Sequence, residues 1–182
     1  MRAILLSLAI AFLLPAVAAA DQDDPRLDRL FAVLQTTEDT REASVAEQMI
    51  WTIWIHSDDE RVTDIMRRGI RAMGQQRYGH ALELFDELVG QAPEFAEAWN
   101  KRATVHYLLG NLEESIADVE RTLALEPRHF GALSGLGQIH LLRDEQEAAL
   151  FAFERALEVH PHLSGARTMS KMLGERLRGR NL

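Results

Sequence analysis

The sequence repeats itself with a period of 34 residues, and no other feature limits the possible folds as strongly. Segments 62–95, 96–129 and 130–163 align without a gap, with small residues at the eighth and twentieth places and proline at the thirty-second. The matching residues are Gly69, Ala103 and Gly137; Ala81, Ser115 and Ala149; and Pro93, Pro127 and Pro161. A fixed period of this kind indicates an array in which each unit buries its apolar face against its neighbours.

Each copy contains two stretches with the apolar spacing of an amphipathic helix, separated by a turn. In the middle copy the turn is Gly110-Asn111, and the spaced residues are Trp99, Ala103, His106 and Tyr107, then Ile116, Val119 and Leu123. We expect each copy to be a helix hairpin in which the small residues of the eighth and twentieth places face each other, so that the helix axes approach to about 8 Å. The proline cannot continue a helix but fits the first turn of the next one.

The middle copy resembles the consensus of the tetratricopeptide repeat (TPR) family, with the family's residues in place at Trp99, Ala103, Gly110, Ser115 and Pro127. The other two copies depart modestly, because Ala72 and His140 replace a usual aromatic residue and Leu88 replaces a usual alanine. The resemblance implies an all-α fold. It would be a right-handed α-solenoid of three TPR hairpins with a degenerate N-terminal hairpin and a C-terminal cap helix.

The first twenty residues have the three parts of a secretory signal peptide. Arg2 provides a basic start, residues 3–14 are uncharged and almost wholly apolar, and Ala18-Ala19-Ala20 forms a small-residue cleavage site. We expect cleavage after Ala20 and a periplasmic protein of an exported bacterial type, since the strong bias to arginine among the basic residues hints at a high-GC bacterial genome. An uncleaved membrane anchor is the alternative, although a spanning helix needs about 20 apolar residues and Pro15 interrupts this stretch.

Residues 21–61 predict a further pair of helices, which we interpret as a degenerate hairpin that caps the array. Carrying the 34-residue frame back to 28–61 places Gln35 and Glu47 where the other copies have their small contact pair. Trp51 and Trp54 lie near its end in an apolar stretch. Large aromatic residues at helical spacing are usually buried, which favours core packing, and an exposed docking surface is the alternative.

Residues 164–182 predict a cap helix with one apolar and one basic face. Its only acidic residue is Glu175, against five basic residues, which are Arg167, Lys171, Arg176, Arg178 and Arg180. Positive charge near a helix C-terminus complements the helix dipole. An acidic partner or anionic lipid head groups are the alternative explanation.

Composition and motifs argue against several functional classes. The formal net charge of −8 is unlike that of a nucleic-acid-binding surface, which needs clustered basic residues. The absence of cysteine excludes disulfides, thiolate metal sites and a lipid anchor at the cleavage site. No phosphate-binding loop or nucleophile turn occurs, and we expect neither enzymatic activity nor a cofactor.

The histidines are the best candidates for metal ligands. His106 and His140 lie 34 residues apart, at the same place of adjacent copies, but Ala72 holds that place in the first copy. Two ligands are too few for a tight zinc site, and the pair His160 and His162 also lacks a third ligand nearby. We therefore expect structural histidines and no metal.

The resemblance also implies a binding site, because the first helices of TPR copies line a concave groove that holds peptide segments. The family's carboxylate clamp needs basic residues at places that here carry Met66, Ile70, Lys101, Gly131 and Gly135, so we do not expect recognition of a C-terminal carboxylate. The predicted peptide-binding residues are Met66, Ile70, Met73, Asn100, Lys101, Thr104, Tyr107, Ser134, Gln138 and Leu141.

These observations predict a non-enzymatic protein–protein interaction adaptor of the cell envelope. It would bind a partly apolar peptide or helix of another envelope protein. The alternative is a self-associating homo-oligomeric scaffold whose groove is occupied by its own flanking helices or by a second copy.

Overall fold

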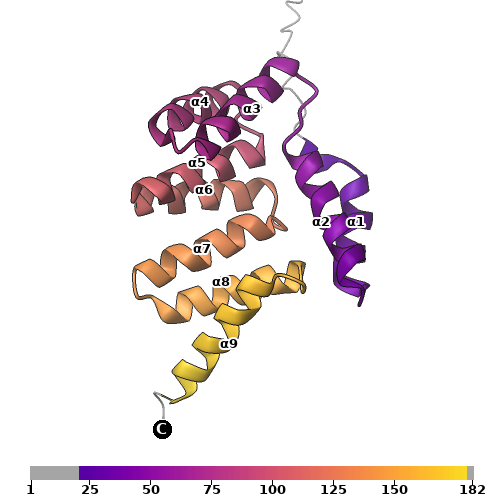
Figure 1. The fold of residues 1–182 in the computed structure, drawn as a ribbon, viewed down its shortest axis with the longest axis vertical. Helices are drawn as coiled ribbons and strands as arrows, with labels where there is room; N and C mark the ends of the chain where they lie inside the picture. Colours follow the sequence, from indigo (N-terminus) through magenta and orange to yellow (C-terminus); the bar gives the residue numbers. More distant parts are fainter. Residues whose placement is uncertain (1–20, 180–182) are drawn as a thin grey trace, which may run out of the picture.

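A computed structural model describes residues 21–179 of the chain, and these residues form helices and connecting loops without a strand (Figure 1). The predicted signal peptide lies outside the described residues. The elements are η1 (Asp21–Asp23), α1 (Arg26–Thr36), α2 (Thr40–Trp54), α3 (Glu60–Gly74), α4 (Tyr78–Gln91), α5 (Ala96–Leu109), α6 (Leu112–Leu125), α7 (Phe130–Leu142), α8 (Gln146–Val159) and α9 (Ser164–Gly179). None of the helices in this part of the chain is long and apolar enough to span a membrane.

The three 34-residue copies are three helix hairpins, α3–α4, α5–α6 and α7–α8, stacked in chain order (Figure 1). The tight turn inside each hairpin has a left-handed residue at the same place of the repeat: Gln76 with φ 58°, Gly110 with φ 81° and Asp144 with φ 57°. Only the middle copy has glycine there, the residue that adopts a positive φ without a steric penalty. The repeated backbone conformation shows that the turn is set by the hairpin geometry as well as by the local residue.

Each hairpin is closed by a pair of residues of complementary size. A Cβ atom added at Gly69 would lie 2.5 Å from Cε1 of Phe85, and one added at Gly137 would lie 2.7 Å from Cε1 of Phe153. The eighth-place glycines therefore face the phenylalanines of the twenty-fourth place, which corrects the expectation that they face the twentieth. The twentieth place is still a close contact in the middle copy, where the Ser115 hydroxyl donates to the carbonyl oxygen of Ala103 at 2.8 Å.

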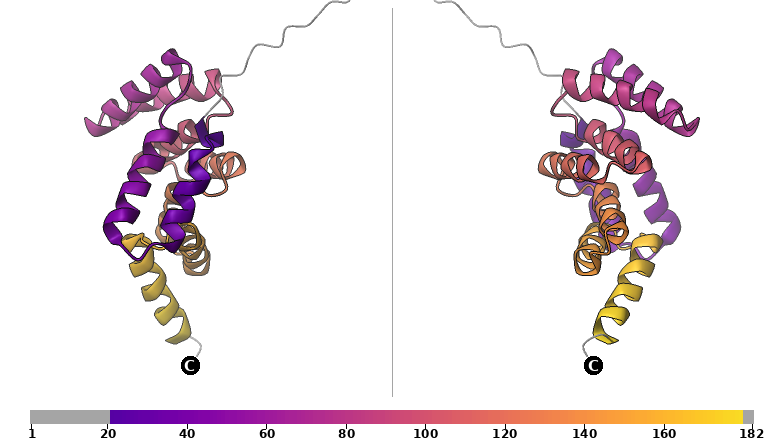
Figure 2. Two further views of the ribbon diagram at one scale, coloured as in Figure 1. Left: turned by 90° about the vertical axis from the view of Figure 1, so that its right-hand side faces the viewer. Right: turned by 90° about the vertical axis from the view of Figure 1, so that its left-hand side faces the viewer.

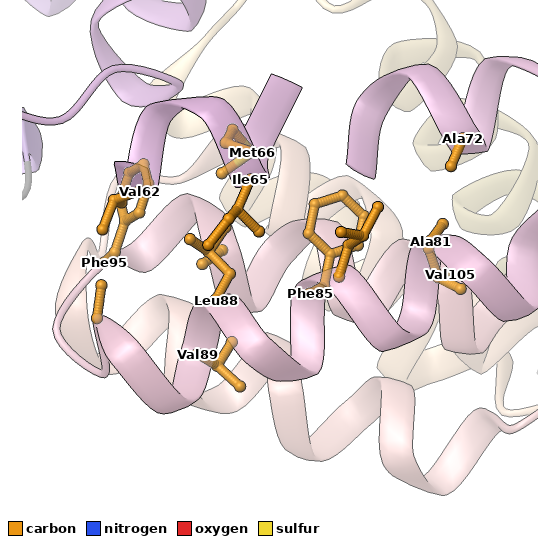
Figure 3. Packing of buried hydrophobic residues seen from close by; sticks show 13 residues of the cluster. Val62, Ile65, Met66, Ala72, Ala81, Phe85, Leu88, Val89, Phe95 and Val105 are labelled. Atoms are coloured by element: carbon orange, nitrogen blue, oxygen red, sulfur yellow. The ribbon is translucent and has the colours of Figure 1, made fainter. Parts of the chain in front are cut away.

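The core of the first copy is continuous with the second. Met66, Phe85 and Leu88 are fully buried together with Phe95 and Val105, which lie just before and within α5 (Figure 3). Apolar contacts across the boundary between copies are the usual source of stability in such arrays.

The N-terminal hairpin, α1–α2, lies elsewhere than predicted. Instead of stacking on α3 as a fourth unit, it runs alongside the second and third copies (Figures 1 and 2). Its apolar face forms one cluster with Phe130, Val159 and Leu163 from the loops and helix ends of those copies. The two polar residues at the places of the small pair face the third copy instead, since Gln35 Nε2 donates to the carbonyl oxygen of Glu158 and Glu47 lies 3.3 Å from His160 Nε2.

The C-terminal helix α9 packs on α8 and extends beyond the stack (Figure 1). It buries Ala166 and Leu173, while Lys171 and Arg178 are exposed. This arrangement is the one expected of a cap helix, which covers an apolar end of the array and presents a polar face to solvent.

Candidate peptide-binding groove

A cleft of about 200 Å³ lies between α5 and α7, on the face formed by the first helices of the second and third copies. Its polar side chains are Asn100, Thr104 and Tyr107 from α5 and Gln138 from α7. The remaining lining is small or apolar, and consists of Ala103, Ser115, Val119, Gly131, Ala132, Gly135 and Ile139.

Two glycines of α7 determine how far this cleft extends. No heavy atom lies within 4 Å of the Cβ position at Gly135, so the space above it is open. At Gly131 the space is filled, because Cη2 of Trp51 lies 2.6 Å from the Cβ position. One end of the cleft is therefore closed by the N-terminal hairpin, and the other is open.

A second hollow, of about 310 Å³, adjoins the first at Gln138, which lines both. It lies between α7 and the start of α9 and includes Ser134, Phe153 and Gly165. Glu47 of α2 forms part of its wall. Together the two hollows make a groove whose floor belongs to the repeats and whose rim includes the hairpin.

The structure brings together five of the predicted groove residues: Asn100, Thr104, Tyr107 and Gln138 in the cleft, and Ser134 in the second hollow. The prediction for Met66 is wrong, since this residue is fully buried in the core of the first copy and cannot contact a ligand.

The other predicted residues are engaged in packing. Ile70 and Met73 pack against the core of the first copy, and Leu141 packs against the core of the third. None of these three lines either hollow of the groove.

Lys101 is held inside a buried polar cluster at the covered end of the groove. Its Nζ lies 2.7 Å from Oε1 of Glu97, whose side chain is only 1% exposed, and 5.2 Å from the ring centroid of Trp51. The other oxygen of Glu97 accepts hydrogen bonds from Asn100 Nδ2 at 2.8 Å and from His129 Nε2 at 2.8 Å. The cation of Lys101 is thus neutralised within the fold.

The charge of Glu97 is stabilised in spite of its burial. Removal from water acts to raise the pKa of this carboxyl, but the nearby charges of Lys101 and His129 and their hydrogen bonds lower its pKa to about 2. Glu97 is therefore ionised at neutral pH. A buried carboxylate with several partners fixes the positions of the groups around it, which here join α5, α7 and, through Trp51, α2.

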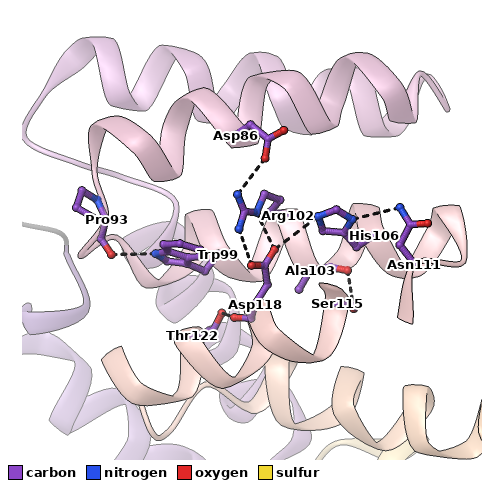
Figure 4. A network of polar contacts seen from close by, with 10 residues as sticks. All are labelled: Asp86, Pro93, Trp99, Arg102, Ala103, His106, Asn111, Ser115, Asp118 and Thr122. Carbon is purple, nitrogen blue, oxygen red and sulfur yellow. Dashed lines mark hydrogen bonds and ion pairs between the residues drawn. The ribbon is translucent and has the colours of Figure 1, made fainter. Parts of the chain in front are cut away.

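A second polar network lies between α4, α5 and α6 (Figure 4). Arg102 donates two hydrogen bonds of 2.7 Å to Asp118 and one of 2.9 Å to Asp86, and the bonds to Asp118 are the main reason that the pKa of Arg102 is raised. His106 Nε2 is 4.0 Å from Asp118 as well. The network fastens the first copy to the second and takes no part in the groove.

The histidines that the sequence singled out have separate partners. His106 faces Asp118, and His140 Nδ1 lies 2.6 Å from Glu145 in its own copy. Within residues 21–179 no group of three or more histidine and carboxylate side chains is arranged to hold a metal ion. Each of these histidines has a carboxylate partner of its own hairpin.

Glu47 and Trp51 are the residues of the N-terminal hairpin at the groove that sequence reasoning missed. They lie on α2, outside the repeats, and the 34-residue frame assigns them to a capping unit. The polar residue at the small contact place, Glu47, was a signal that this hairpin does not stack like the others. It did not indicate where the hairpin would lie.

The fold and its groove define a class of protein, a solenoid of helix hairpins with a concave binding face. A family model described as tetratricopeptide repeat matches residues 66–123 and 109–162. The chain is 35% identical over 161 residues to a TPR repeat-containing protein of Rhizobium etli, across 88% of this chain and 79% of that relative. This chain therefore belongs to the tetratricopeptide repeat family.

Two further likenesses concern the repeats. The Hsp70-Hsp90 organizing protein of Triticum aestivum is 24% identical over 127 residues, which is 68% of this chain but only 21% of that much longer protein. The first TPR of Spaghetti (RPAP3), solved bound to the HSP90 peptide SRMEEVD, superposes with a TM-score of 0.63 at 20% identity, covering 66% of this chain and 96% of that one. The likeness to the first TPR of Spaghetti (RPAP3) is one of fold alone.

Proposed function

We propose that this chain is a non-enzymatic adaptor that binds a partly apolar segment of another protein in the cleft between α5 and α7. The observation that carries the proposal is the open space above Gly135. It is flanked by side chains that donate and accept hydrogen bonds, Asn100, Thr104, Tyr107 and Gln138. A volume of about 200 Å³ accommodates one or two side chains, with the polar groups placed to bind the backbone of the same segment.

The known binding of a similar domain supports a peptide as the ligand, since the first TPR of Spaghetti holds an Hsp90 peptide. The chemistry of recognition differs here. That peptide is acidic, whereas the cleft of this chain offers no side-chain cation and its nearest one, Lys101, is paired with Glu97. We propose that the bound segment is anchored by apolar side chains and by its backbone, and that its terminal carboxylate is not required.

The site of action that we propose is the bacterial cell envelope, most simply the periplasm. The support is the basic start, apolar stretch and small-residue cleavage site of the first twenty residues. Cell fractionation with N-terminal sequencing tests this, and the expected result is an envelope protein that begins at Asp21. Full-length chain in the cytosol would contradict export, and full-length chain in the membrane fraction would indicate a retained anchor.

Peptide binding is tested by a photocrosslinking residue placed at Gln138 in the native cell, with Glu120 on the opposite helix layer as the control position. We expect one heterologous partner to be captured from Gln138 and none from Glu120. Gly135→Leu should abolish this capture because its side chain fills the cleft. The same change should leave the protein folded and raise its melting temperature, since glycine within a helix costs about 0.5–1 kcal/mol relative to other residues.

A self-associating scaffold is the second candidate, and the closure of one groove end by Trp51 favours it. In that case crosslinks from Gln138 would join copies of this chain, and the melting temperature would rise with protein concentration. Crosslinks to a different protein, together with a melting temperature independent of concentration, would exclude the scaffold.

A further inference from the structure

We infer that the α1–α2 hairpin is a proton-sensitive cover over one end of the groove, held in place by histidines of the loops that follow the second and third copies. The inference concerns the hairpin alone and stands whether or not a peptide binds to the cleft. It rests on where three histidine rings lie and on what each ring nitrogen contacts.

His129 lies between the hairpin and the repeats and is completely buried. Its ring stacks on Trp54 of α2, with 4.1 Å between the centroids and 10° between the planes, and Trp51 lies edge-on at 5.6 Å. On the side of the repeats, Nε2 is 2.8 Å from Glu97, and Nδ1 accepts a hydrogen bond from the backbone of Ala132 at 3.1 Å. Both ring nitrogens therefore have partners, with Nε2 bonded to Glu97 and Nδ1 acting as an acceptor.

His160 is placed similarly in the loop after α8, but its Nε2 is near a carboxylate without forming a hydrogen bond to it. Its Nδ1 accepts a hydrogen bond from the backbone of His162 at 3.3 Å, and its Nε2 lies 3.3 Å from Glu47 of α2. The ring of His160 is also buried and meets Phe130 edge-on. His162 completes the set, because its Nε2 is 3.1 Å from the carbonyl oxygen of Thr37 in the loop between α1 and α2.

The charged groups around these rings are few. Glu97 and Lys101 face His129, while Glu47 and His162 face His160. An ion pair between the hairpin and these loops also joins Arg128 to Asp28 at 2.6 Å, with Glu126 beside Arg128.

A second proton on the ring of His160 would weaken the cover. Its Nδ1 accepts the backbone N–H of His162, so a proton placed there would face another donor. Burial lowers the pKa of His160 below its usual value, and the attraction of Glu47 offsets this only in part. A released hairpin would expose the ring to water, where it takes up a proton more easily.

The sign of the pH effect follows from this difference. The pKa of His160 is lower in the covered state than in the released state. Its contribution to the stability of the covered state is therefore fully present above about pH 6.5 and is lost as the pH falls below that value. Protonation of His160 in the released state shifts the equilibrium toward release by up to about tenfold per pH unit. Release would uncover Gly131 and Glu97 and lengthen the groove toward the first turn of α5 and α7.

Tryptophan accessibility tests the inference. Trp51 and Trp54 lie on the face of α2 that contacts the repeats, and Trp99 lies outside this interface. In a Trp99→Phe background, we would measure acrylamide quenching of fluorescence at pH 7.5 and 5.5, with far-UV circular dichroism as the check on folding. We expect quenching to increase severalfold at pH 5.5 while the helical signal is retained. Equal quenching at the two pH values would overturn the inference.

Three further variants assign the effect to the buried rings. His160→Gln keeps an acceptor for the His162 backbone but cannot gain a proton, so it should reduce the increase in quenching. His80→Gln, at an exposed position of α4, should leave the increase unchanged. Glu47→Gln removes the group that favours protonated His160 in the covered state. This widens the difference in pKa between the covered and released states, so the change should move the transition to higher pH. If His160→Gln fails to fold, the Glu47→Gln shift decides the question, and a transition that stays in place or moves to lower pH contradicts the inference.

Discussion

At the scale of single residues, each hairpin is packed through two places of the repeat, the eighth and the twenty-fourth, whose side chains are complementary in size. Glycine at the eighth place faces phenylalanine at the twenty-fourth in the first and third copies. In the middle copy Ala103 stands at the eighth place, and the twenty-fourth is the smaller Val119, in the same buried cluster. The summed volume of the two side chains is thus similar in the three copies, as expected of close-packed protein interiors.

We predict that Gly137→Ala destabilises the protein and that Phe153→Val restores part of the loss. The new methyl group meets the Phe153 ring at 2.7 Å, and overpacking of this kind costs about 1–3 kcal/mol, against a gain of up to about 1 kcal/mol from replacing glycine within a helix. Phe153→Val alone leaves a cavity and costs about 2–4 kcal/mol.

A double-mutant cycle by urea denaturation measures the coupling. The double variant should be more stable than the sum of the single changes predicts, by about 1 kcal/mol or more. Strict additivity would show that the two places do not share one space. Ala149→Leu, at the twentieth place of the same copy, is a useful control because it overpacks a different contact.

At the scale of elements, the N-terminal hairpin behaves as a separate unit attached to the side of the array. Its own core is formed by α1 and α2, and its contact with the repeats is concentrated in Trp54, Phe130 and Phe31, with Arg128 stacked 4.3 Å from the Phe31 centroid. A few aromatic residues therefore decide whether this hairpin is docked, while the stacking of the three copies does not depend on them.

Trp54→Ala should release the hairpin and leave the three copies folded. Truncation of a buried tryptophan costs about 3–5 kcal/mol, and here the loss falls on one docking interface. Limited proteolysis with mass spectrometry checks this, and we expect rapid cleavage within residues 37–59 with a protected fragment that begins near α3. Trp99→Ala, at a half-buried position outside the hairpin interface, is the matched control and should leave residues 37–59 protected.

The two parts of the chain also differ in how much the sequence revealed. The three hairpins follow from a period, small residues and proline, all of which act between neighbours in the chain, so they could be predicted. The position of α1–α2 depends on contacts between residues about a hundred places apart, such as Asp28 with Arg128, and no local pattern encodes them. For the same reason Tyr107 and Gln138 could be placed in the groove, but Trp51 could not.

At the scale of the whole molecule, stability depends on a buried carboxylate at the meeting point of three helices. The pKa of Glu97 is lowered to about 2 in the folded protein, against about 4.3 in an unfolded chain. A lowered pKa contributes stability that is fully present above the unfolded value and is lost as the pH falls toward 2.

Glu97→Gln should destabilise the protein at pH 7 and flatten its stability between pH 4.5 and 2. The shift in pKa corresponds to a contribution on the order of 3 kcal/mol, and the glutamine leaves Lys101 without its partner. Urea denaturation across this pH range provides the measurement. Equal pH dependence of variant and parent would mean that Glu97 does not carry the acid sensitivity. Glu83→Gln, at an exposed pair with His80, is the control.

The attachment of the hairpin to distant copies has a consequence for how the array comes apart. In a simple linear array each unit touches only its neighbours, so unfolding can start at either end. Here a hydrogen bond joins Arg128 to Asp28, which lies 100 residues earlier in the chain. The first copy therefore lies within a closed loop of chain. Closing such a loop slows folding, because its entropy is lost before the distant contacts form. Once closed, it protects the first copy from fraying.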